Sequence, residues 1–125
     1  MLKPKAFDHV GLFVTNLDES LKFYTKGLGL ELLRRRGAGR EGSAVLGVGN
    51  AEFNVFHNPA SIGSGAPQRV DHLCLVMDYA TIDDLIMALR DAEIPVANSP
   101  VKRSDGMALF VHDPDGLRVE LLVKD

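Results

Sequence analysis

Two histidines of this 125-residue chain lie in similar sequence segments. Each is followed at a similar distance by a polar residue in an apolar run. His9 lies in the segment 8–14, and His72 holds the same place in the segment 71–77, 63 positions later (72 − 9). Glu120 follows His72 by 48 positions (120 − 72), and Asn54 follows His9 by 45 positions (54 − 9). The chain therefore offers four comparable sites, which hold His, Asn, His and Glu.

These residue types suit a metal. Two neutral imidazoles and one carboxylate bind a divalent transition metal and leave further positions open for water or substrate. We therefore predict His9, His72 and Glu120 as metal ligands, with Asn54 as a fourth ligand or a pocket residue. A carboxylate between two apolar neighbours is costly unless a partner receives it. Spacing alone leaves open the alternative that both histidines are structural and that Glu120 is a surface charge on an edge strand.

The repeat indicates two similar supersecondary units that position these residues. Each unit is predicted to be βαβββ, with its helix capped by Asn16 in the first and by Thr81 in the second. The predicted strands of the first unit are 7–14, 30–35, 43–48 and 52–57. Those of the second are 70–77, 95–96, 107–111 and 117–123. The last two strands are joined by Asp-Pro-Asp-Gly at 113–116, a typical tight-turn sequence.

We expect an α+β fold in which the two tandem βαβββ modules form a curved mixed sheet, or cup, around the metal site. One domain covers residues 1–125, with modules at about 5–58 and 69–125. The linker at 59–68 is rich in Ser, Gly and Ala. A chain of this length is sufficient to bury a core.

Alternation along a strand assigns side chains to faces. His9 and His72 each share a face with the second and fourth residues that follow them, and Asp8 and Asp71 point to the opposite face. The two aspartates are therefore not expected to partner the adjacent histidines. Cys74 is predicted to be a small buried residue. The predicted pocket is small and apolar, lined by Gly11, Phe13, Phe56, Cys74, Val76 and Leu109.

Composition excludes several classes of function. A net charge of −3 with scattered basic residues gives no case for a nucleic-acid binder. No apolar run approaches the roughly 20 residues of a membrane helix, and residues 1–5 lack the apolar core of a signal peptide. A single cysteine provides no disulfide framework. We expect a cytoplasmic protein that binds a small molecule.

Three segments carry a combined pattern that covers nearly the whole chain. They are the repeated Asp-His strand, the helix end Phe23-Tyr24-Thr25-Lys26-Gly27-Leu28-Gly29-Leu30, and the final Asp113-Pro114-Asp115-Gly116-Leu117-Arg118-Val119-Glu120-Leu121. This pattern resembles the vicinal oxygen chelate superfamily, which contains glyoxalase I, bleomycin resistance proteins and extradiol dioxygenases. The resemblance implies paired βαβββ modules, a homodimer, and a divalent metal bound by His9, His72 and Glu120. The metal could be Fe, Zn, Ni, Co or Mn.

The resemblance further implies an isomerase or lyase that acts on a small molecule with vicinal oxygens. In such enzymes the metal stabilises a developing oxyanion while a glutamate, here Glu120, moves the proton. Several short segments of the sequence are most similar to glyoxalase I. However, Asn54 occupies a slot that usually holds a glutamate, and Phe13 stands where a glutathione-binding arginine is expected. These departures disfavour glyoxalase I itself.

Two alternatives stay open at this point. An extradiol ring-cleaving dioxygenase would use Fe(II) on the same three ligands, and His57 would then be a candidate acid–base residue. A non-catalytic, ligand-sequestering resistance protein would need an aromatic cleft, which a chain with no Trp and 6% aromatic residues supplies poorly. The residues predicted to contact a substrate are Phe13, Phe56, Asn58, Lys102 and Arg103.

Overall fold

The computed structural model describes residues 1–61 and 70–125, and its contacts divide the chain into two units, Met1–Ala66 and Pro67–Asp125. Most of the predicted linker at 59–68 lies outside the described residues. Its first part, Pro59–Ser61, forms a short 3-10 helix, η2. Each unit is described below by itself.

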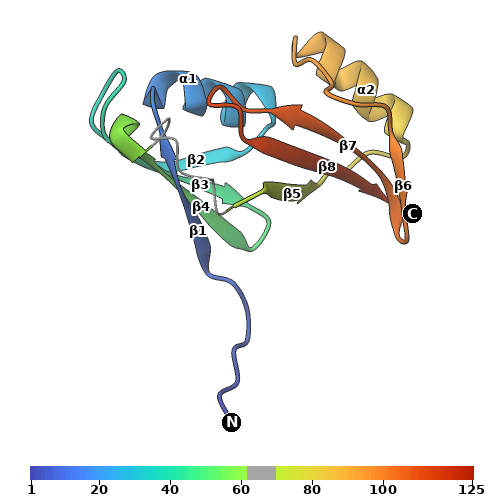
Figure 1. The fold of residues 1–125 in the computed structure, drawn as a ribbon, viewed down its shortest axis with the longest axis horizontal. Coiled ribbons are helices and arrows are strands. Elements are labelled where there is room, and N and C mark those ends of the chain that lie inside the picture. The colour runs from blue at the N-terminus through green and yellow to red at the C-terminus, as the bar shows by residue number, and fades with distance from the viewer. Residues whose placement is uncertain (62–69) are drawn as a thin grey trace. The chain divides into compact units, whose positions relative to one another are not determined.

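Unit 1 has the predicted element order (Figure 1). Its first strand, β1, is followed by a helix whose final turn widens to a π-helix, and three further strands complete the unit. The elements are β1 (His9–Val14), α1 (Leu17–Lys22), η1 (Phe23–Gly27), β2 (Glu31–Arg36), β3 (Ser43–Val48) and β4 (Ala51–His57).

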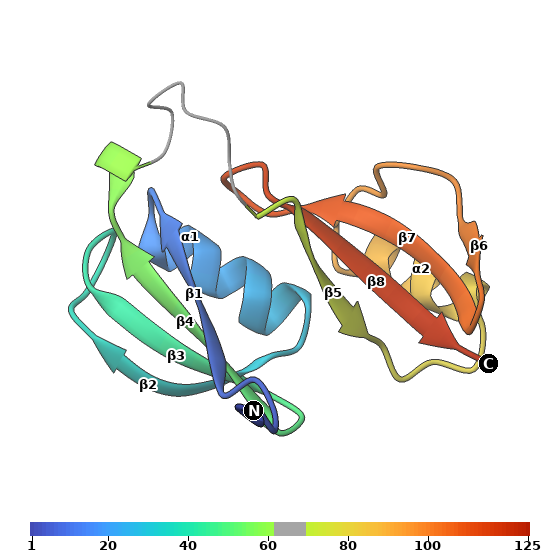
Figure 2. The ribbon, with the colours of Figure 1, turned by 60° about the horizontal axis from the view of Figure 1, so that its bottom comes forward.

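Unit 2 repeats this order (Figure 2). Its elements are β5 (His72–Val76), α2 (Ile82–Asp91), β6 (Val101–Arg103), β7 (Gly106–His112) and β8 (Arg118–Lys124). The spatial order is β5-β8-β7-β6, which corresponds to β1-β4-β3-β2 in unit 1. In both sheets the first and last strands of the unit are parallel neighbours, and the remaining pairs are antiparallel. The predicted α+β fold of two tandem βαβββ modules is therefore confirmed.

Both helices begin at the predicted caps. The Asn16 side-chain oxygen accepts the N–H of Glu19 at 3.2 Å, and Thr81 Oγ1 accepts the N–H of Asp84 at 3.1 Å. Each helix covers one face of its own sheet. The side chains between a helix and its sheet are fully buried, including Leu17, Val55, Leu85 and Leu121. The opposite face of each sheet is open, and it carries His9 in unit 1 and His72 in unit 2.

One strand prediction was wrong. The strand expected at 95–96 lies instead at Val101–Arg103. The segment before it still contacts β7, because the Ala97 N–H donates to the Phe110 carbonyl at 2.8 Å. The Asn98 side chain accepts the Phe110 N–H at 2.8 Å. A side-chain oxygen thus replaces a backbone acceptor here, which strand propensity alone does not predict.

The turn before β8 is built around Asp113. Its Oδ1 accepts the N–H groups of Asp115 and Leu117, at 2.9 and 2.8 Å, and Gly116 has φ +85°. Such a positive φ is accessible to glycine at little cost. The predicted tight turn is confirmed, and it sets the register of β8. In the described part of the chain, no helix is long and apolar enough to span a membrane.

Candidate functional site

Glu120 lies on the open face of the unit 2 sheet, on a strand with neighbours on both sides. Its register partners are Cys74 on β5 and Phe110 on β7. The residue is only 7% exposed, although it is a carboxylate. The alternative of an edge-strand surface charge is therefore wrong, because β8 is an inner strand of its sheet.

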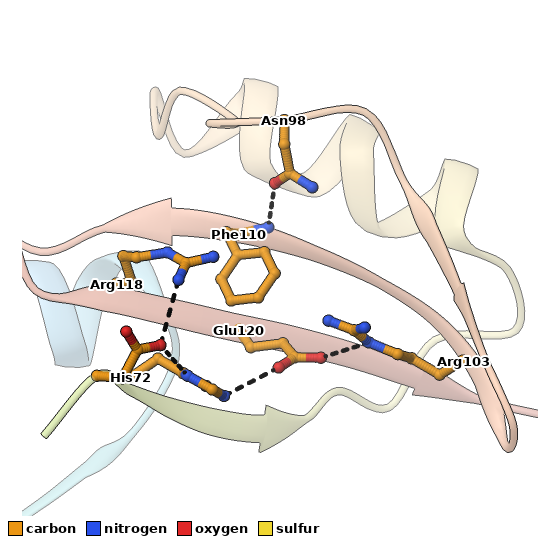
Figure 3. A network of polar contacts seen from close by, with 7 residues as sticks. His72, Asn98, Arg103, Phe110, Arg118 and Glu120 are labelled. Atoms are coloured by element: carbon orange, nitrogen blue, oxygen red, sulfur yellow. Dashed lines mark hydrogen bonds and ion pairs between the residues drawn. The ribbon is translucent and has the colours of Figure 1, made fainter.

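Both carboxylate oxygens of Glu120 have a basic neighbour (Figure 3). His72 Nε2 lies 3.2 Å from Oε1, and Arg103 Nε donates to Oε2 at 3.1 Å. A buried carboxylate is costly unless it is paired and hydrogen-bonded. These two contacts supply that compensation.

The second ring nitrogen of His72 is held by Asp71, with 2.7 Å between Nδ1 and Oδ2. A neutral imidazole that donates from Nδ1 presents an unprotonated Nε2 to Glu120. Neither that nitrogen nor a carboxylate oxygen can then donate a hydrogen bond. With this tautomer, Nε2 and Oε1 are two acceptors that lie 3.2 Å apart, and a cation bound to both would satisfy them.

Asp71 is itself fixed by Arg118 at the start of β8. Arg118 donates to Asp71 Oδ2 at 3.2 Å, and its guanidinium carbon lies 4.2 Å from the centre of the Phe110 ring. The hydrogen bond with His72 lowers the pKa of Asp71, and Arg118 lowers it further. The carboxylate therefore stays ionised at neutral pH, and it orients the His72 ring toward Glu120.

The prediction that Asp8 and Asp71 would not partner their neighbouring histidines was wrong. His9 Nδ1 lies 2.7 Å from Asp8 Oδ2, as in the second pair. Strands β1 and β5 begin at the histidines, so the aspartates precede the regular alternation on which the prediction relied. A carboxylate behind a histidine is a common way to set the tautomer and basicity of a metal ligand.

Unit 1 contains the counterpart of this arrangement. Gly11 pairs with Asn54 across β1 and β4, as Cys74 pairs with Glu120 across β5 and β8. His9 and Asn54 therefore occupy the open face of their sheet, as predicted from spacing. The side-chain oxygen of Asn54 is buried and has no hydrogen-bond partner among the described residues. It is a spare acceptor on the same face as the imidazole of His9.

These donors fit a divalent metal. With metal–ligand distances of about 2.0–2.2 Å, two donors on one ion lie roughly 3.0–3.4 Å apart. The 3.2 Å between His72 Nε2 and Glu120 Oε1 falls in this range. The predicted set is divided between the units, with His9 in unit 1. Within residues 1–61 and 70–125, no three His, Cys, Asp or Glu side chains form a ready metal cluster.

The predicted aromatic contacts lie on the open face of unit 1. Phe13 and Phe56 are register partners and are 52% and 41% exposed, with their rings edge to face at 6.4 Å. His57 pairs with Val14, so it shares the helix-covered face and lies across the sheet from Asn54. This placement gives the predicted acid–base role of His57 no support. Asn58 follows β4 and donates its backbone N–H to Val14.

Two predictions for the pocket of unit 2 were wrong. Cys74 is exposed, because it lies on the open face beside Glu120. Partial burial raises the pKa of its thiol, and the Glu120 charge adds to this effect. Leu109 is fully buried, because it pairs with Leu121 on the helix-covered face.

Register also separates the two predicted basic contacts. Arg103 pairs with Gly106 and shares the face of Glu120, whereas Lys102 pairs with Met107 on the opposite face. Sequence reasoning missed Arg118, although its position two residues before Glu120 on one strand is a signal for a shared face.

Comparison with known proteins agrees with this arrangement. The sequence matches the Glyoxalase/Bleomycin resistance protein/Dioxygenase superfamily over residues 6–121. It is 32% identical to a probable lactoylglutathione lyase of Synechocystis, over 91% of this chain and 92% of that protein. It is 29% identical to a probable chloroplastic lactoylglutathione lyase of Arabidopsis thaliana, of which it spans only 34%.

A solved structure gives the same result. The glyoxalase family protein of Enterococcus faecalis superposes with a TM-score of 0.74 at 25% identity, covering 94% of this chain and 97% of that one. The sequence match, the paired βαβββ units and the repeated Asp-His strands are mutually consistent. The chain belongs to the Glyoxalase/Bleomycin resistance protein/Dioxygenase superfamily.

Proposed function

We propose that this protein is a divalent-metal-dependent enzyme of lyase or isomerase type that acts on a small molecule with vicinal oxygens. The proposed ligands are His9, His72 and Glu120, with the Asn54 oxygen as a further donor or a pocket group. The observation that carries the proposal is the 3.2 Å separation of His72 Nε2 and Glu120 Oε1, with His72 Nδ1 held by Asp71. His9 is included because it repeats the same pairing with Asp8.

A bound divalent ion would polarise the substrate oxygens and stabilise the negative charge that develops when a proton leaves the adjacent carbon. The chain's own residues would orient the ligands and move the proton. Asp71 and Arg118 hold the His72 ring in place, so little reorganisation is needed there during reaction. Glu120 is the only carboxylate of the proposed ligand set, and we propose it as the group that moves the proton.

The substrate is proposed to differ from that of the lactoylglutathione lyases. Asn54 cannot accept a proton as a base, and Phe13 cannot pair with a carboxylate of glutathione. The open face of unit 1 instead presents two exposed aromatic rings, Phe13 and Phe56. Such a surface favours a compact organic ligand over a charged peptide.

The decisive experiment is the metal content of protein purified without oxygen, followed by assays with a catechol and with methylglyoxal plus glutathione. We expect about one zinc, nickel, cobalt or manganese ion per chain and no oxygen uptake. Stoichiometric iron with oxygen uptake on the catechol would replace the proposal with an extradiol dioxygenase. Failure to bind any metal, even after reconstitution, would overturn the proposal and leave a ligand-sequestering protein.

The homodimer and the cytoplasmic location stay predictions. Sedimentation of the purified protein would test the first. In a swapped dimer, His9 of one chain would join His72 and Glu120 of another, so mixing His9→Ala and His72→Ala variants would restore metal binding in the mixed dimer.

A further inference from the structure

Arg103 lies beside Glu120 and is placed to bind a charged group of the ligand. We propose that the small molecule bound at this site is an organic anion, a carboxylate with a hydroxyl or oxo oxygen on the adjacent carbon, and that Arg103 binds its carboxylate. This inference deepens the function proposed above and rests on it for the second oxygen of the ligand.

Strand register is the first argument. Because β6 pairs with β7 at Arg103 and Gly106, the Arg103 side chain lies on the open face with Glu120 and Phe110. Lys102, the adjacent residue of the same charge, lies on the other face. Only one of the two basic side chains is therefore positioned beside the proposed ligands.

The unused donors of the guanidinium are the second argument. Arg103 contacts Glu120 through Nε alone, at 3.1 Å, and its terminal nitrogens have no hydrogen bond within the described parts of the chain. Figure 3 shows a dashed line from Nε of this guanidinium to the Glu120 carboxylate. A guanidinium presents several donors in a rigid fork that matches the two oxygens of a carboxylate. The Arg103 side chain is 39% exposed, so a ligand can reach it.

Arg118 differs from Arg103 in this respect. Its guanidinium lies over the Phe110 ring and donates to Asp71, so it is already engaged in holding His72. A ligand that competed for Arg118 would disturb the orientation of that ring. Arg103 can add a ligand while its Nε keeps Glu120 in place.

Charge balance is the third argument. Glu120 and Arg103 neutralise one another in the protein as it stands. A divalent cation on Glu120 would leave an excess positive charge in a partly buried site, and an anionic ligand would compensate for it. A carboxylate with an adjacent oxygen meets this demand and provides the vicinal oxygens of the proposed function.

The test is calorimetric binding of glycolate and of its neutral amide, glycolamide, at low salt. The proteins are the wild type, Arg103→Met and the matched control Lys102→Met, each with its metal content measured. We expect the wild type and Lys102→Met to prefer glycolate over glycolamide by at least about tenfold, as for a hydrogen-bonded ion pair. Arg103→Met should lose this preference while it keeps its metal and its affinity for glycolamide.

Two outcomes would overturn the inference: equal preference for glycolate in Arg103→Met and the wild type, or no preference in the wild type. Either can occur with normal metal content, which leaves the proposed function standing. A wild type without metal would instead remove the proposed function, and an Arg103-dependent preference for glycolate would then still support an anion site. Arg103→Lys keeps the charge without the fork, and we expect it to bind glycolate with intermediate affinity.

Discussion

The two units of this chain share one topology and one histidine arrangement but differ in what surrounds the histidine. In each, an aspartate lies 2.7 Å from the ring nitrogen of a histidine at the start of the first strand. The inner strand beside it carries Glu120 in unit 2 and Asn54 in unit 1. Glu120 has two basic partners, whereas the Asn54 oxygen has none among the described residues.

The difference extends to the neighbouring positions. Arg118 is the register partner of His72 and pairs with Asp71, whereas the register partner of His9 is Glu52, whose carboxylate lies 3.6 Å from Arg34. The open face of unit 2 thus carries a network of paired polar side chains. The open face of unit 1 carries the His9 imidazole and the side-chain oxygen of Asn54, unpaired within the described residues, beside exposed aromatic rings. The comparison indicates that the open face of unit 2 holds a carboxylate with basic partners, whereas the open face of unit 1 holds an uncharged amide beside aromatic rings.

The largest expected effect is on metal affinity, and it comes from changing Glu120, whose equivalent position in unit 1 holds Asn54. Glu120→Gln should weaken metal binding by about a hundredfold or more. Loss of a ligand should cost more than the roughly 10–100-fold loss of metal affinity that is typical when a residue hydrogen-bonded to a ligand is changed. Glu52→Gln is the matched control in unit 1, and it should leave the affinity unchanged. Titration with a competing chelator measures both, and circular dichroism checks that the fold is retained. Full metal affinity in Glu120→Gln would remove the carboxylate from the ligand set.

A smaller effect is expected from a pair of asparagines, one in each unit. Asn98→Ala leaves the partly buried Phe110 N–H without its acceptor and should lower the free energy of unfolding by about 1–3 kcal/mol. Asn54→Ala removes an oxygen that has no such partner, so the change should stay below about 1 kcal/mol. Urea denaturation compares the two variants. Equal losses would mean that Asn54 has a structural partner after all.

The smallest effect concerns one arginine in the sheet of each unit, Arg118 on β8 and Arg34 on β2. Arg118→Met loses the guanidinium over Phe110, worth about 0.5–1 kcal/mol at an exposed site. Arg34→Met loses only a 3.6 Å surface pair with Glu52 and should change the stability by less than about 0.5 kcal/mol. Thermal melting under one set of conditions ranks the two. A larger loss for Arg34→Met would reverse the comparison.

Local sequence patterns predicted most of the fold. The caps at Asn16 and Thr81 and the turn at Asp113 were predicted because a side chain meets a backbone group only two to four residues away. The second strand of unit 2 was misplaced, because the acceptor for Phe110 is a side chain twelve residues distant. Such a contact leaves no periodic signal in the sequence.

For the candidate site, the sequence by itself determined which residues are equivalent. The repeat and the spacing paired His9 with His72 and Asn54 with Glu120, since strand alternation follows from backbone geometry alone. Only the tertiary structure decided which side chains lie beside these residues. Strand register placed Arg103 beside Glu120 and Lys102 across the sheet, and it exposed Cys74. Register depends on pairing between distant segments, so a one-residue shift would have exchanged the faces of Arg103 and Lys102 without changing either residue.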